Sequence, residues 1–277
     1  MLIYPLFKGK KSPLVVESLT AHTCSNNIGQ KIRWYWAQGN PDADVVLLCH
    51  GHCADHTSFS RLLAFLQDAG FSLLMLDFRA HGKSEGKITG IGLCEGNDIV
   101  SVIRDAKSRG LLGKGKLIAA YGRSMGAASL VHAAAQAPEI DAFILESCFA
   151  RLRSIAARDA WRLFGVPDTP LLDVVLAIAS WRTGISYSKN NPVEKAGDIG
   201  TRPVLLIHDE LDPRATLATH KLWQAALTGE DEWIVPGAGH VKAFSVKPKE
   251  FRRKFLSFLA KAGLRSNYGA ASGTTAF

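Results

Sequence analysis

Ser124 has the setting of a catalytic nucleophile. It lies in the run Gly122-Arg-Ser-Met-Gly126, directly after the apolar segment 117–121 and directly before an Ala-rich helical segment. Glycine two residues away on each side allows a tight strand-to-helix turn that exposes the hydroxyl group. This nucleophile elbow predicts acyl transfer at Ser124, because a serine hydroxyl attacks a carbonyl carbon once a base takes its proton.

The serine requires a histidine base that a carboxylate orients. The chain offers an acid and then a histidine on loops after two later apolar strands, in the segments 206–212 and 235–240. The resulting order Ser124, Asp212, His240 is typical of a nucleophile elbow on a parallel sheet. Asp212 is the preferred acid because it lies beyond the strand end, where a loop residue can turn towards His240.

Several other acids and histidines compete for these roles. Three acids near the strand ends remain as alternatives to Asp212, namely Asp209, Glu210 and Glu146. Three histidines lie inside helical segments or at a strand end, and we interpret them as structural residues: His132, His208 and His220.

Two backbone N–H groups are predicted to stabilise the oxyanion of the reaction. One is the N–H of Met125, at the start of the helix after the nucleophile, and the other is that of His52, in the loop His50-Gly-His-Cys53. A metal site is the competing interpretation of this loop, through His50, His52 and His56. Their spacing matches no compact zinc pattern. We therefore predict no metal and no organic cofactor.

Strand-length apolar runs alternate with segments of helical spacing, which predicts a parallel sheet covered on both faces. The predicted strands cover residues 45–49, 73–76, 116–121, 142–145, 203–207 and 232–235, after an antiparallel hairpin of 14–23 and 31–38. The predicted helices cover residues 57–68, 95–109, 125–137, 216–227 and 247–262. The fold class is therefore α/β, with a mostly parallel eight-stranded sheet.

An apolar insertion interrupts this alternation. Residues 149–202 form helical segments separated by prolines, and we interpret them as a lid over a substrate pocket. The core domain then comprises residues 1–148 and 203–265, and residues 266–277 form a flexible tail. Three aromatic residues of the lid are predicted to bind substrate: Trp161, Phe164 and Trp181.

The composition excludes several other classes of protein. The 277 residues are 47% hydrophobic and 21% charged, which rules out disorder, collagen and a coiled coil. The 33 basic and 25 acidic residues give a net charge of +8, but the basic residues form no single stripe, so no nucleic acid is predicted as a partner. Five cysteines without a CxxC pair indicate a reducing compartment. With no apolar run of membrane-spanning length, we expect a cytoplasmic protein.

Taken together, these motifs resemble those of serine hydrolases with the α/β-hydrolase fold. The similarity extends from about Val45 to Leu259. Within that superfamily, the runs 145–149, 191–193 and 239–244 are similar to the BEM46-like and YqkD-like group of lidded esterases. The chain departs from the usual pattern twice, with Ala80 and Asp209 at positions where the family usually has glycine.

The resemblance and the residues imply the same activity. We expect a serine hydrolase that cleaves small-molecule esters with apolar acyl or aryl groups of modest size. The same triad also serves thioesterases, amidases and peptidases, and these remain alternatives. A ligand-binding protein without catalytic activity, built on a hydrolase scaffold, is the alternative from a different class.

Overall fold

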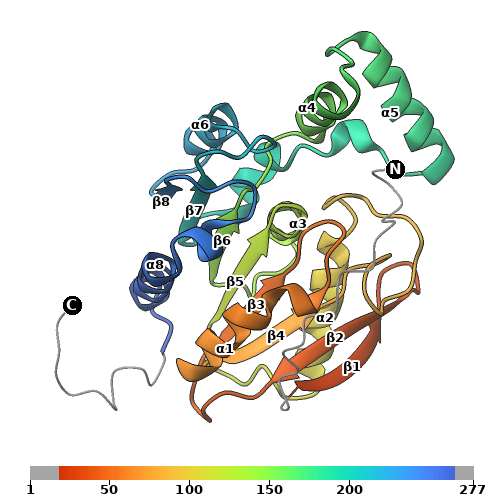
Figure 1. Cartoon of the computed structure of the whole chain (residues 1–277). Helices are drawn as coiled ribbons and strands as arrows, with labels where there is room; N and C mark the ends of the chain where they lie inside the picture. The colour runs from red at the N-terminus through yellow and green to blue at the C-terminus, as the bar shows by residue number, and fades with distance from the viewer. Residues whose placement is uncertain (1–18, 266–277) are drawn as a thin grey trace.

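The computed structural model describes residues 19–265 and contains one eight-stranded sheet (Figure 1). The strands are Leu19–Ser25 (β1), Lys31–Ala37 (β2), Val45–Cys49 (β3), Ser72–Leu76 (β4), Ile118–Arg123 (β5), Ala142–Glu146 (β6), Val204–Asp209 (β7) and Asp231–Val235 (β8). Their spatial order is β1-β2-β4-β3-β5-β6-β7-β8. β2 pairs antiparallel with β1 and β4, and the six strands from β3 to β8 run parallel. The predicted sheet is therefore confirmed.

Helices cover both faces of the sheet. The longer ones are Ser60–Asp68 (α1), Gly96–Ser108 (α2), Met125–Ala133 (α3), Leu152–Phe164 (α4), Pro170–Thr183 (α5), Leu217–Ala226 (α6) and Pro248–Lys261 (α8). Shorter turns are His56–Phe59 (η1), Tyr187–Lys189 (η2), Pro192–Ile199 (η3) and Ala243–Val246 (α7). Buried side chains place α1 and α8 on one face and α2, α3 and α6 on the other.

The core explains why the apolar runs become strands. All five residues of β3 are buried, because this strand lies inside the sheet with helices above and below. On one face, Phe255 of α8 makes edge-to-face contacts with Phe65 of α1 and Tyr121 of β5. On the other face, Ile99 and Leu130 are fully buried. The helices on both faces thus hold the sheet in place, and the loops that follow its strands are positioned by it.

Some predicted boundaries differ from the structure. The helix predicted over 125–137 ends at Ala133, and the strand predicted from residue 116 begins at Ile118. The predicted strand 14–23 is described only from Leu19 onwards. Residues 14–18 and the predicted tail 266–277 lie outside the described residues.

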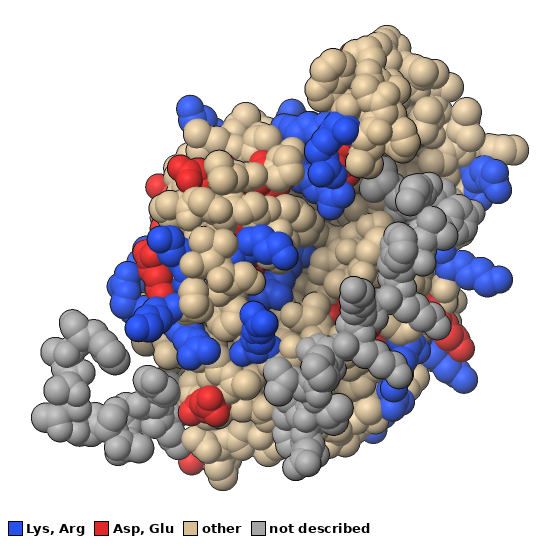
Figure 2. All heavy atoms as spheres, viewed as in Figure 1, with Lys and Arg blue, Asp and Glu red and all other residues tan. Residues whose placement is uncertain are grey.

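The predicted insertion contains two neighbouring helices, α4 and α5, which form a lobe at the upper right of Figure 1, followed by the shorter elements η2 and η3. None of the residues of α5 is buried, although most of them are apolar. Figure 2 shows that the visible surface of this lobe carries few charged side chains. Between residues 19 and 265, no helix combines the length and the apolar character needed to cross a membrane.

Candidate active site

Ser124 occupies a sharp turn between β5 and α3. Its φ of 51° is rare for a residue with a side chain, so the turn stores backbone strain. A Cβ atom at Gly122 would lie 2.5 Å from the backbone nitrogen of Ala127, and one at Gly126 would overlap the Cys49 carbonyl of β3. Both glycines are therefore required, because the turn passes too close to the adjoining backbone for side chains.

The structure brings the predicted nucleophile, base and acid together. Nε2 of His240 lies 2.9 Å from Oγ of Ser124, and Nδ1 of His240 lies 2.7 Å from Oδ2 of Asp212. A carboxylate only accepts hydrogen bonds, so Nδ1 carries the proton and donates it to Asp212. Nε2 is then the acceptor for the hydroxyl of Ser124. This is the tautomer that a general base requires.

Asp212 is held as an anion. Its Oδ1 accepts hydrogen bonds from the backbone N–H groups of Arg214 at 2.8 Å and Ala215 at 3.0 Å. Burial favours the neutral acid, but the hydrogen bond and the charge of His240, together with these two N–H groups, lower the pKa of Asp212 below its ordinary value. An ionised acid at this position stabilises the imidazolium form of His240.

The two predicted oxyanion donors belong to segments that lie next to the serine. Met125 is the first residue of α3, so its N–H has no acceptor within the helix. Gly51 lies in the loop after β3, and a Cβ at this position would lie 3.7 Å from Cβ of Ser124. His52 follows Gly51 directly. The loop that carries the second predicted donor therefore passes beside the nucleophile.

The three competing acids have other partners. Oδ2 of Asp209 accepts the hydroxyl of Ser147 at 2.7 Å, and Oε2 of Glu210 accepts the N–H of Gly237 at 2.8 Å. Glu146 accepts a hydrogen bond from the hydroxyl of Tyr121 and forms an ion pair with Arg123 at 3.3 Å. Of the four candidates, Asp212 is the one in contact with the histidine.

Two of the alternative acids, Asp209 and Glu146, hold the backbone after His240 together with Ser147, which the sequence analysis did not select. The N–H of Val241 donates to Oγ of Ser147 at 3.2 Å, and that of Lys242 donates to Oδ2 of Asp209 at 3.3 Å. The N–H of Ala243 donates to Oε1 of Glu146 at 3.3 Å. Side chains at the ends of β6 and β7 thus fix the loop that carries the base. Asp209, at a position where the resembled family usually has glycine, was the sequence feature that pointed to these contacts.

The raised pKa of Asp209 leads to a prediction of how the free energy of unfolding depends on pH. Burial, and secondarily the negative charge of Glu146, raises the pKa of Asp209 from 3.8 to about 7 in the folded protein. The folded protein therefore favours the neutral acid. The resulting contribution of Asp209 to the free energy of unfolding is complete below pH 3.8 and is lost as the pH rises through about 7. We expect Asp209→Asn to remove this loss. Urea unfolding of both proteins between pH 4 and 9 measures it, and parallel stability profiles would contradict the assignment.

The segment after β4 forms hydrogen bonds to the loop after β3, which carries the second predicted oxyanion donor. Oδ1 of Asp77 accepts the backbone N–H of His56 at 2.9 Å and its Nδ1–H at 2.7 Å. The N–H of Phe78 donates to Nε2 of His50 at 3.0 Å. Two of the three histidines in the metal interpretation, His50 and His56, therefore have structural partners, and among residues 19–265 no cluster of three side chains that could hold a metal ion occurs.

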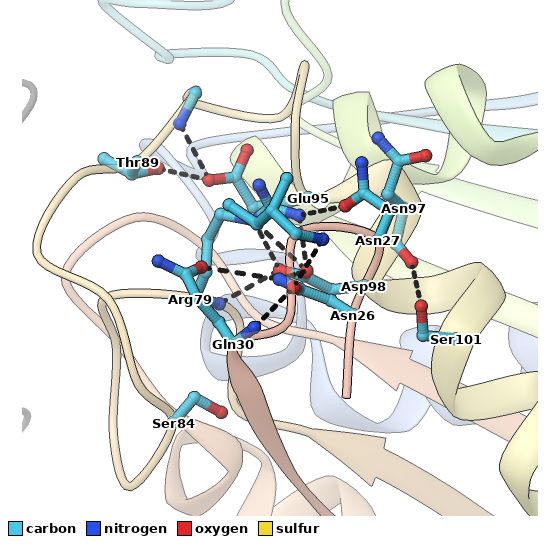
Figure 3. A network of polar contacts seen from close by, with 12 residues as sticks. Asn26, Asn27, Gln30, Arg79, Ser84, Thr89, Glu95, Asn97, Asp98 and Ser101 are labelled. Carbon is cyan, nitrogen blue, oxygen red and sulfur yellow. Dashed lines mark hydrogen bonds and ion pairs between the residues drawn. The ribbon is translucent and has the colours of Figure 1, made fainter. Parts of the chain in front are cut away.

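Arg79 anchors the same segment to α2. Figure 3 shows its guanidinium group against the carboxylate of Asp98, within a polar network that also includes Asn26 and Glu95. The shortest contact joins Nη2 of Arg79 to Oδ1 of Asp98 at 2.7 Å, and both side chains are buried. Asn26 donates to the same oxygen at 2.9 Å. These contacts make Arg79 a scaffold residue of the segment after β4.

Ala80 adopts the left-handed conformation that the usual glycine would adopt, with φ 61°. Its N–H still donates to the carbonyl of Glu85 at 2.9 Å, so the turn is kept in spite of the Cβ. Because this strain costs about 1 kcal/mol, we expect Ala80→Gly to raise the free energy of unfolding by up to that amount. Thermal unfolding measures the change. Ala177→Gly in the exposed helix α5 is the matched control and should lower stability.

The three aromatic residues predicted to bind substrate are all exposed, but they differ in their surroundings. Trp161 lines a cavity together with Pro213, the residue after Asp212. Phe164 and Trp181 are 73% and 85% exposed and do not line that cavity. Of the predicted substrate-binding residues, Trp161 is therefore the one that the structure brings near the acid loop.

Comparison with known proteins agrees with this architecture. A family model described as the alpha/beta hydrolase fold matches residues 44–175. The chain is 26% identical to YqkD of Bacillus subtilis over 250 residues, which cover 87% of this chain and 79% of that protein.

Two solved structures have the same overall shape. The esterase Pf2001 of Pyrococcus furiosus superposes with a TM-score of 0.75 at 23% identity, covering 95% of this chain and 98% of that one. The enol-lactonase of Burkholderia xenovorans superposes with a TM-score of 0.61 at 20% identity, covering 86% and 100%. Together with the strand order and the turn at Ser124, these matches show that the chain has the alpha/beta hydrolase fold.

Proposed function

We propose that this chain is a serine hydrolase that cleaves carboxylic esters through an acyl-enzyme. The observation that carries the proposal is the hydrogen-bonded series Asp212, His240, Ser124, with contacts of 2.7 and 2.9 Å. Its two contacts have the length and order that general-base activation of a serine requires. The esterase and the enol-lactonase among the solved structures of this fold support ester bonds as the target.

The reaction has two steps. In the first, Oγ of Ser124 attacks the ester carbonyl while Nε2 of His240 takes the hydroxyl proton, and Asp212 stabilises the resulting imidazolium. His240 then returns this proton to the leaving alcohol, which departs and leaves the acyl group on Ser124. In the second step His240 takes a proton from water as the water oxygen attacks the acyl carbonyl; the bond between the acyl carbon and Oγ of Ser124 then breaks, His240 returns the proton to Oγ, and the acid is released.

The oxyanion of each step lies between two backbone donors in this proposal. The N–H groups of Met125 and His52 approach the substrate oxygen from α3 and from the loop after β3. Removing one such donor costs about 3 kcal/mol in other serine hydrolases, so the pair supplies a large part of the rate. Side-chain changes at these two positions leave the N–H groups in place, because both belong to the backbone.

Residues 149–202 act as a lid in this proposal. The supporting observation is the apolar surface of α4 and α5, where large apolar side chains are exposed to solvent. The insertion follows β6 in the chain. Exposed apolar surface of this kind is typical of a binding site. It favours an ester whose acyl or aryl group is apolar and of modest size.

Hydrolysis of a p-nitrophenyl ester series, from acetate to long acyl chains, tests the proposal. We expect turnover with an optimum at short or medium chains, and inhibition by an organophosphonate that adds its mass to the peptide containing Ser124. A chain that is inert towards every ester, or labelled at another residue, would show that the proposed activity is wrong.

A further inference from the structure

A cavity of about 570 Å³ lies between the lobe and the loop that carries the acid. Its walls include Arg158, Trp161 and Arg162 of α4, Asp168 of the loop between α4 and α5, and Pro213. This volume is in the range of cavities that hold a small organic molecule. No step of the proposed reaction so far uses the two arginines.

The cavity carries an excess of positive charge. Asp159 is a buried acid that contacts both Arg162, at 3.3 Å, and Arg214, at 3.2 Å. Nη1 of Arg158 donates to a neutral partner, the carbonyl oxygen of Arg214, at 2.8 Å. Two guanidinium groups therefore share the carboxylate of Asp159, and the third, that of Arg158, has a carbonyl oxygen as its partner. Figure 2 shows basic side chains gathered where the lobe joins the rest of the molecule.

The acid on the rim of the cavity does not cancel this excess. Asp168 forms an ion pair with Arg153 at 2.9 Å, and Arg153 also contacts Asp173 at 2.6 Å. Asp168 and Asp173 are thus engaged with another arginine. A guanidinium group that has a carbonyl oxygen as its partner keeps its full charge and most of its five N–H donors for a ligand.

The cavity lies next to the loop that carries the acid of the candidate catalytic site. Pro213 follows Asp212 in the chain, and the N–H of Arg214 donates to Oδ1 of Asp212. The positive charge of Arg214 also acts on the loop after β3: burial raises the pKa of the Cys53 thiol, and this charge partly offsets that rise. At Pro213, the cavity therefore adjoins the residue that the chain places directly after Asp212.

We propose that this cavity binds the part of the substrate that carries an anionic group, a carboxylate or a phosphate, and that Arg158 pairs with that group. The inference rests on the proposed function and narrows its substrate class to negatively charged esters. The indole of Trp161, which is 63% exposed, offers an apolar face for the chain between the ester and the anion.

A matched set of three esters tests this assignment. They are p-nitrophenyl pentanoate, the p-nitrophenyl half-ester of glutaric acid, and the analogous ester whose acyl chain ends in a phosphonate. We expect kcat/KM for at least one anionic ester to exceed that for the neutral ester by about tenfold, the effect of one charge-assisted hydrogen bond. The preference should decline at high salt, because ions screen the pair.

Variants of Arg158 locate the effect. Arg158→Gln should lower the ratio of anionic to neutral kcat/KM by about tenfold, and Arg158→Lys should preserve most of it. Arg182→Gln, at the exposed end of α5, is the matched control and should leave the ratio unchanged. Thermal unfolding shows whether each variant is folded.

Each result is decisive for one of the two proposals. Hydrolysis of all three esters with no preference, or a preference that survives Arg158→Gln in a folded variant, overturns the cavity assignment and leaves the esterase proposal standing. A wild-type chain that is inert towards all three overturns both. A preference for one anion over the other identifies the carboxylate or the phosphate.

Discussion

Ser124→Ala is expected to lower kcat for p-nitrophenyl acetate by about 10⁴-fold or more. The hydroxyl of Ser124 is the group 2.9 Å from Nε2 of His240, so its removal leaves the base without a nucleophile to activate. The oxyanion donors belong to the backbone and remain. The residual rate therefore reflects water attack within an intact site.

A second serine of the same helix gives the control. Ser129 is buried in α3 and donates its hydroxyl to the carbonyl of Met125 at 2.8 Å. Ser129→Ala should keep kcat within about threefold of the wild type, because the change removes a neutral hydrogen bond to the backbone of its own helix, which contributes about 1 kcal/mol to stability rather than to the reaction. If Ser124→Ala retained more than about a tenth of the activity while folded, another residue would be the nucleophile.

The turn at Ser124 could be predicted from sequence because its causes are local. Gly122 and Gly126 are both within two residues of the serine, and the structure shows that each faces backbone at a distance that excludes a Cβ. The flanking strand and helix are also local patterns. A motif that depends on five consecutive residues is therefore readable without knowledge of the rest of the chain.

The acid was harder to assign, since Asp209, Glu210 and Asp212 lie within four residues of one another. Spacing alone cannot rank them, because the direction of each side chain depends on how β7 ends. The structure directs Asp209 towards Ser147 and directs Asp212 towards His240. Ser147 donates from the end of β6, 62 residues away in sequence. No local pattern reports such a long-range contact.

The insertion shows the same limit. Its apolar composition predicts a surface that covers a substrate pocket, and its two longer helices form as expected. The composition does not say which aromatic residue faces a cavity. Trp161 does so because the helix it belongs to packs against the acid loop, where Arg158 contacts Arg214, whereas Trp181 lies at the far end of α5. Tertiary packing, rather than residue type, separates the two.

Asp212→Asn is expected to lower kcat by about 10³-fold to 10⁴-fold while KM changes little. An asparagine at this position can donate its amide N–H to Nδ1 of His240, which moves the ring proton to Nε2. The base then faces Ser124 with a proton instead of a lone pair. It also loses the anion that stabilises the imidazolium, which Asp212 supplies through its 2.7 Å contact.

Asp209→Asn gives the matched comparison, because it makes the same chemical change at the alternative acid three residues earlier. An asparagine at 209 keeps an oxygen for the hydroxyl of Ser147 and for the N–H of Lys242, so the loop after His240 stays in place. We expect kcat to fall by no more than about tenfold, because the loop keeps its acceptor and its hydrogen bonds weaken at most by the difference between a charged and a neutral bond. The kcat values of the two variants, measured at the same pH on the same ester, therefore separate the acid of the triad from an acid that positions the loop. Equal losses in two folded variants would mean that the two carboxylates act as one unit, and a larger loss at 209 would transfer the role of the orienting acid from Asp212 to Asp209.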